Sequence, residues 1–149
     1  SIATLSQVAA HAAHHPVLRI GPDDMDDPDS AVRRALDFLL AHRDDRPLVA
    51  SSAPHVEVAA AQARHGTKTL ADRLDGFFAR LATSARAAGF RAIVVAGGET
   101  SGAVMHALGS LPFVVGAEIA PGVPALYPDA DGEGLVLKSG NFGGPDFFD

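Results

Sequence analysis

The chain has 149 residues, 47% of them hydrophobic, and a formal net charge of −6 at pH 7. This length suits one domain with a sizeable core, and the acidic balance argues against nucleic acid or an anionic membrane as main partner. The absence of cysteine excludes disulfides and thiolate chemistry, and no apolar run approaches the ~20 residues of a membrane span. The N-terminus is unlike a signal peptide. We expect a cytoplasmic protein and, because no initiator Met is present, a piece of a longer chain.

Helical periodicity and short apolar runs alternate through most of the chain. Thr69 with Asp72 resembles a capping box, Asp27 can cap a helix that has Pro28 at its first position, and Gly89 and Gly109 are typical helix ends. In chain order the patterns predict a helix from Thr4 to about His14, a strand at Val17–Ile20, a helix after Asp27, a strand at Pro47–Ala50, a helix from Val56 to Arg64, a long helix from Thr69 to Gly89, a strand at Ala92–Ala96, a helix from Ser101 to Leu108, and strands at Phe113–Val115 and Leu135–Lys138.

The last third of the chain is rich in Gly and Pro and loses helical periodicity. We interpret Pro121–Pro124 as a rigid turn region and place Gly132 and Gly134 in a hairpin-like connection. Strands separated by helices predict one α/β domain over residues 1–149, with a mainly parallel sheet and helices on both faces. Glycine-rich loops follow the carboxyl ends of its strands, which is where such sheets bind ligands.

The most informative segment is the turn Gly97-Gly98-Glu99-Thr100-Ser101-Gly102. It joins a β-branched strand to a helix, and the free N–H groups of a helix N-terminus make a natural seat for phosphate. The turn is not a Walker loop, because Ala103 and Val104 stand where that motif needs Lys and Ser/Thr, and it lacks the GxGxxG spacing. Glu99 would repel a phosphate unless it orients a Mg²⁺ hydration shell, caps the helix or accepts from a ribose hydroxyl. The alternative is an ordinary strand-to-helix turn.

A second glycine-rich loop, Lys138 to Gly144, also follows a strand. Its glycines let the backbone approach a ligand closely, and Lys138 supplies a cation. The alternative is a C-terminal turn without a ligand.

Three further features of the sequence are better explained as structural than as catalytic or metal-binding sites. His11, His14 and His15 share a helix face at metal-ligand spacing, but we expect them to face solvent. His106 is expected to be a packed or surface residue, and the acidic run Asp23–Asp27 is expected to be a solvated loop leading into a helix cap, since it does not match an EF-hand. We predict no metal site formed by these side chains.

Several motifs together resemble the C-terminal nucleotide-binding domain of the four-carbon acid sugar kinases. These ATP-dependent enzymes phosphorylate acids such as threonate, erythronate and 3-oxo-tetronate. The family's Gly-Ser-Cys-Ser turn, followed by Ala-Thr and a Gln, is matched from its last serine onward. The matching segments are Ser1, Ala3, Thr4 and Gln7, then Pro47–Ser52, Ala59–Arg64, Gly97–Val104, Ala107–Gly109, Gly116–Pro124, Leu137–Gly143 and Asp146–Phe148.

The resemblance implies an ATP site with Mg²⁺ and a reaction that transfers the γ-phosphoryl group to a hydroxyl of a four-carbon acid. It places the nucleotide against Ser1, the turn from Gly98 to Ser101 and the loop from Gly140 to Gly143. From the residues themselves we expect the amides between Gly97 and Gly102 to bind phosphate, with the Thr100 and Ser101 hydroxyls as extra donors. We also expect Lys138 to be a phosphate partner, and Gly140 and Gly143 to allow close approach. The sugar acid would bind through an N-terminal substrate domain that is absent here, so no catalytic residue is assigned and the chain alone is not expected to be competent. A non-catalytic nucleotide-binding or interaction module is the alternative, and a homo-oligomer is left open.

Overall fold

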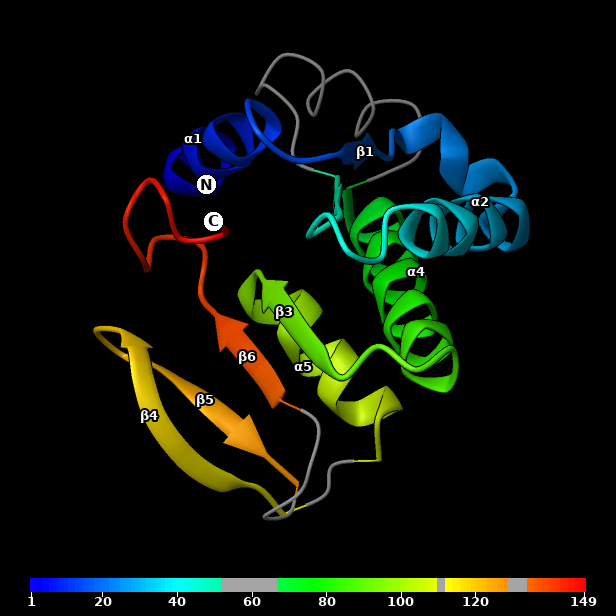
Figure 1. Ribbon diagram of the computed structural model, residues 1–149. Helices are drawn as coiled ribbons and strands as arrows, with labels where there is room; N and C mark the ends of the chain where they lie inside the picture. Colours follow the sequence, from blue (N-terminus) through cyan, green and yellow to red (C-terminus); the bar gives the residue numbers. More distant parts are fainter. Residues whose placement is uncertain (52–66, 110–111, 129–133) are drawn as a thin grey trace.

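The computed structural model describes residues 1–51, 67–109, 112–128 and 134–149. The helix predicted from Val56 to Arg64 lies outside these ranges. No helix in them is long and apolar enough to cross a membrane. The elements, labelled in Figure 1, are α1 (Ile2–Ala12), β1 (Val17–Arg19), the 3₁₀ helix η1 (Pro22–Asp26), α2 (Pro28–Ala41), β2 (Leu48–Ala50), α4 (Thr67–Ala87), β3 (Ala92–Ala96), α5 (Gly98–Ala107), β4 (Val114–Ala120), β5 (Val123–Tyr127) and β6 (Gly134–Lys138).

The described strands form two sheets. One holds β1 and β2 in parallel, and the other has the order β3-β6-β5-β4. Within the second sheet β3 and β6 are parallel, whereas β5 pairs antiparallel with both β6 and β4. The prediction of a mainly parallel sheet is therefore wrong for this half of the molecule. The physical reason is connection length, because the tight turn between β4 and β5 can join only antiparallel neighbours, while parallel strands need a crossover.

The strand β5 was missed because prolines dominate its sequence neighbourhood. The turn is limited to Pro121 and Gly122, which has φ of +75°, and the chain resumes as a strand at Val123. Val123 and Ala125 are buried at alternate positions, which is the period of a half-buried strand. Pro124 is tolerated because the β4–β5 ladder is irregular next to its partner Glu118.

Helix boundaries follow their caps. Asp27 caps α2 as predicted and accepts a hydrogen bond from the Ser30 amide at 3.0 Å. Gly89, with φ of +87°, follows the end of α4 as predicted. The long helix begins at Thr67, so Thr69 lies inside it and is not a cap. The helix predicted from Ser101 begins three residues earlier, at Gly98, because Gly97 occupies the cap position and its carbonyl oxygen accepts from the Ser101 amide at 2.9 Å.

The core consists of two clusters. In the first, α2 and α4 pack around Phe77, which is 1% exposed, together with Met25 and Ala35. In the second, α4 and α5 pack on β3 and β6 around Val104, also 1% exposed. The second cluster fixes α5 against β3 and β6, and so determines where the turn at Gly97 and Gly98 lies.

Candidate functional site

The two glycine-rich loops lie next to each other at one edge of the larger sheet. In the parallel pairing of β3 with β6, Ala96 stands opposite Lys138. The Gly97 amide then donates to the Lys138 carbonyl oxygen at 2.8 Å. The turn after β3 and the loop after β6 therefore leave the sheet side by side, at the carboxyl ends of both strands.

The turn presents the N-terminus of α5. Gly97 has φ of +122°, which glycine adopts without strain. The first-turn amides of Gly98, Glu99 and Thr100 have no intrahelical acceptor, and the helix dipole adds positive potential there. A Cβ at Gly98 would meet nothing within 4 Å, so the space beside Gly98 is open. This arrangement can hold an anion.

The two hydroxyls of the turn differ in their surroundings. The Thr100 hydroxyl donates to a carboxylate oxygen of Asp75 on α4 at 2.8 Å, which leaves its oxygen as an acceptor. The Ser101 hydroxyl is buried, and no hydrogen-bond partner for it lies among the described residues. Asp75 brings a carboxylate to the turn from a distant part of the sequence, and no motif pointed to it.

The N-terminus of α1 lies against the loop after β6 and forms a third side of the candidate site, beside the turn at Gly97 and that loop. The Ser1 and Thr4 hydroxyls both donate to the Gly140 carbonyl oxygen, at 2.6 and 2.9 Å. A Cβ at Gly140 would lie 3.0 Å from Ser1 Oγ and 3.2 Å from Ser1 Cβ, tighter than ordinary contacts. A side chain at Gly140 would therefore press on Ser1, and glycine lets α1 and the loop approach this closely.

Gln7 anchors the rest of this loop. It is 1% exposed, and its side-chain amide donates to the carbonyl oxygens of Phe142, Gly143 and Gly144 at 3.1, 3.1 and 2.8 Å. Its oxygen is buried without a partner in the described part of the chain. A glutamine on an alanine-rich helix gives no local signal of this role, since its partners are more than 130 residues away.

Lys138 is buried within the loop that it begins. It is 1% exposed, its ammonium donates to the Ser139 and Gly140 carbonyl oxygens at 3.3 and 3.2 Å, and it lies 5.6 Å from the Phe147 ring centroid. Burial lowers the pKa of Lys138 from its ordinary value. No ion pair found among the described residues includes it. A buried ammonium without a carboxylate partner favours a nearby anion.

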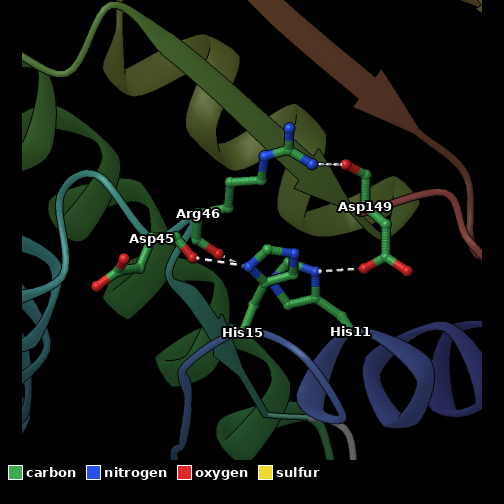
Figure 2. Close-up of polar contacts among 5 residues, drawn as sticks. All are labelled: His11, His15, Asp45, Arg46 and Asp149. Atoms are coloured by element: carbon green, nitrogen blue, oxygen red, sulfur yellow. Dashed lines mark hydrogen bonds and ion pairs between the residues drawn. The ribbon is translucent and has the colours of Figure 1, made fainter.

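The histidine cluster is only partly as predicted. His11 is 2% exposed, so the expectation that it faces solvent is wrong, whereas His14 is exposed. Figure 2 shows how His11 is held: Nδ1 contacts Asp149 Oδ1 at 3.0 Å, and Nε2 contacts the Arg46 carbonyl oxygen at 2.8 Å. The reason is the helix period, which places His11 on the buried face of α1 with Thr4, Gln7 and Val8.

The same cluster brings possible ligand atoms of His11, His15 and Asp149 within 4.8 Å of one another. The two imidazole rings are stacked, with centroids 4.6 Å apart and planes at 26°. A metal ion is bound in the plane of an imidazole ring, and two nearly parallel stacked rings cannot both direct a lone pair at one ion. The geometry therefore fits a structural hydrogen-bond cluster better than a metal centre.

The acidic run and His106 also take structural positions. Asp24 accepts from the Gly21 amide at 2.6 Å and from Arg34 at 2.8 Å, and Asp27 caps α2. His106 is exposed near the end of α5.

Comparison with known proteins places this geometry in a family. Residues 1–148 match the family model described as "Nucleotide-binding C-terminal domain". The chain belongs to this family. This match, together with curated relatives named 3-oxo-tetronate kinase, confirms the resemblance to the C-terminal domain of the four-carbon acid sugar kinases.

Curated relatives include a 3-oxo-tetronate kinase of Methylobacterium radiotolerans, 47% identical over 99% of this chain and 36% of the relative. Another, from Burkholderia multivorans, is 44% identical over 100% of this chain and 35% of the relative. A solved Haemophilus influenzae protein superposes with a TM-score of 0.92 at 30% identity, over 99% of this chain and 36% of that one. The chain thus spans about a third of the length of the relatives that it matches.

Proposed function

We propose that this chain is the ATP-binding domain of a two-domain sugar-acid kinase. The observation that carries the proposal is the parallel pairing of β3 with β6, which places the Gly97–Gly98 turn and the loop after Lys138 at one edge. The similarity to proteins named 3-oxo-tetronate kinase supports the same assignment. The reaction is transfer of the ATP γ-phosphoryl group to a hydroxyl of a four-carbon acid of the 3-oxo-tetronate, threonate or erythronate type.

In this proposal each wall has a distinct part. The amides of Gly98, Glu99 and Thr100 face the phosphates, where the positive end of the α5 dipole favours negative charge. The backbone of the second loop lies beside the nucleotide, with Gly140 packed against Ser1 and Gly143 against Phe147. Ser1 holds that loop, and Lys138 contributes positive charge. Binding and positioning are the contribution of this chain, since phosphoryl transfer depends on orientation and charge neutralisation.

The turn also has the donor chemistry that Mg²⁺ prefers. Asp75 places a carboxylate oxygen 2.8 Å from the Thr100 hydroxyl, and Glu99 lies in the first turn of α5. Carboxylate oxygens and water are the usual protein-side ligands of Mg²⁺, so Asp75 and Glu99 would hold its hydration shell. When bound, the ion would neutralise phosphate charge. In this proposal the sugar acid binds to the longer protein, and any homo-oligomer is formed by the longer protein.

The substitution Gly98→Val tests the phosphate seat. Because a Cβ at Gly98 meets nothing within 4 Å, valine fits the fold and projects into the space proposed for the phosphates. We expect calorimetric binding of ATP with Mg²⁺ to weaken at least tenfold with little change in the melting temperature. Gly76→Val is the matched control, since Gly76 is also helical and open. Unchanged affinity in Gly98→Val would contradict the assignment of this turn.

A separate experiment tests whether catalysis needs the rest of the longer protein. ATP consumption with a four-carbon acid is measured for these 149 residues and for the longer protein. Turnover is expected only from the longer protein. Turnover by the 149 residues alone would overturn the two-domain proposal, and failure of the isolated domain to bind nucleotide at millimolar concentration would favour an interaction module.

A further inference from the structure

A cavity of about 690 Å³ lies between the two sheets. One wall is β2, through Leu48, Val49 and Ala50, and the opposite wall is β3, through Ala92 to Ala96. Among the described strands β2 pairs only with β1, and β3 pairs only with β6. Each sheet therefore ends on a strand edge that borders this cavity.

The composition of β3 is that of an interior strand. Its five residues are all apolar, and three of them are β-branched, which is typical of a strand paired on both edges in an α/β sheet. Val94, in the middle of β3, is nevertheless 50% exposed and lines the cavity. Folded proteins protect open edges with charge, proline or a covering element. The uncharged edge of β3 instead has the character of a surface that receives a further strand.

The position of α1 gives the direction of that strand. Ser1 and Thr4 are bound to Gly140, just beyond the carboxyl end of β6 and hence at the same end of the sheet as the end of β3. A strand parallel to β3 within the cavity would end at this edge, next to Ser1. Thr4, Val8 and His11 of α1 line the cavity, so α1 would pack on the strand that leads into it, as α5 packs on β3.

We propose that the cavity receives one extended segment, the residues that precede Ser1 in the longer proteins of the family, as a parallel strand between β2 and β3. The matched model describes a C-terminal domain, and the chain spans about a third of its relatives, so most of their additional length lies before this region. The slot has a strand edge on both sides. A single extended segment could pair with both edges at once, whereas the edge of a second folded copy would bring its own neighbouring strands against β2 or β3. The resulting sheet would be continuous from β1 to β4.

The proposed strand would also affect the edge of the sheet where the Gly97 turn and the loop after Lys138 lie side by side. A strand ending beside Ser1 would place its following turn next to Gly140 and the turn at Gly97. The strand would pair in this way whether or not nucleotide binds.

Hydrogen exchange on the longer protein tests the proposal. The protein is compared with a variant in which the ten or so residues before Ser1 are replaced by a Gly/Ser linker of equal length. We expect the amides of Leu48–Ala50 and Ala92–Ala96 to exchange at least tenfold faster in the linker variant, while the β4 amides are unchanged. Equal exchange in both proteins would overturn the proposal. Protection that depends on protein concentration would also overturn it, by assigning the slot to another molecule.

If the linker variant does not fold, a cross-linking measurement on the otherwise unaltered protein tests the same strand pairing. A diazirine-bearing aliphatic residue is placed at position 94 of the otherwise unaltered protein and photolysed, with position 115 on β4 as control, since Val115 is 67% exposed. Cross-links from position 94 to the segment before Ser1, absent from position 115, support the proposal. Cross-links only to residues 52–66, to residues after Asp149, or to another molecule refute it.

Discussion

The substitution Lys138→Met tests what the buried ammonium does. In the folded chain it makes two hydrogen bonds at 3.3 and 3.2 Å and lies 5.6 and 5.9 Å from the ring centroids of Phe147 and Phe148. Hydrogen bonds of a charged group contribute about 1.5–3 kcal/mol each, and cation–π contacts about 0.5–2 kcal/mol each. Desolvation of an ammonium costs several kcal/mol in the other direction. The two terms nearly cancel, so we expect the free energy of unfolding without ligand to change by no more than about 1 kcal/mol.

The pH dependence of stability separates charge from packing. Burial lowers the pKa of Lys138, so the folded chain releases this proton at a lower pH than the unfolded chain. Between the lowered and the ordinary pKa the unfolded state binds more protons, and the contribution of this group to stability rises with pH. Urea unfolding at a series of pH values should therefore show the wild type gaining stability relative to Lys138→Met as pH rises toward the ordinary lysine pKa.

Nucleotide affinity gives the functional readout. We expect calorimetry to show ATP binding at least tenfold weaker in Lys138→Met, which is about 1.4 kcal/mol. Lys68→Met is the matched control, because Lys68 is exposed on α4. The reasoning is refuted if Lys138→Met binds ATP as the wild type does, or if it loses more than about 3 kcal/mol of stability, the loss expected when a purely structural buried partner is removed.

Three further substitutions probe the walls of the site by urea unfolding. Gly143→Ala should cost about 2 kcal/mol, because Gly143 has φ of +83° and an added Cβ would collide with the Phe147 side chain; no loss would mean that the loop moves freely. Thr100→Val removes one hydrogen bond to the partly exposed Asp75 and should cost about 1 kcal/mol; Thr100→Ser, which keeps the hydroxyl, should restore most of it. His11→Leu removes two hydrogen bonds and should cost about 2 kcal/mol; equal or higher stability would show that they contribute nothing.

Local sequence determined the elements whose signals are local. The β-branched run of β3, the cap at Asp27 and the terminating Gly89 depend on neighbouring residues, and each lies where predicted. Glycine loops after the predicted strands could be recognised for the same reason. The family followed from several short motifs in fixed order, and the match over residues 1–148 confirms it.

The sequence predictions were wrong where contacts with residues distant in the chain outweigh the local sequence pattern. Pro124 argued against a strand, yet β5 forms because β4 and β6 supply partners on both sides. An alanine-rich helix suggested exposed histidines, yet His11 is buried because Arg46 and the C-terminal segment pack on its face.

The sequence by itself determined that two glycine-rich loops each follow a strand, and that one opens a helix. Only the tertiary structure decided that they share an edge, because that depends on β6 crossing back to pair with β3. The same holds for Gln7, Asp75 and the burial of Lys138, whose roles come from partners distant in the chain or from packing around them. Hydrogen bonds and desolvation act over a few ångströms of space, and separation along the chain does not reveal which residues will meet.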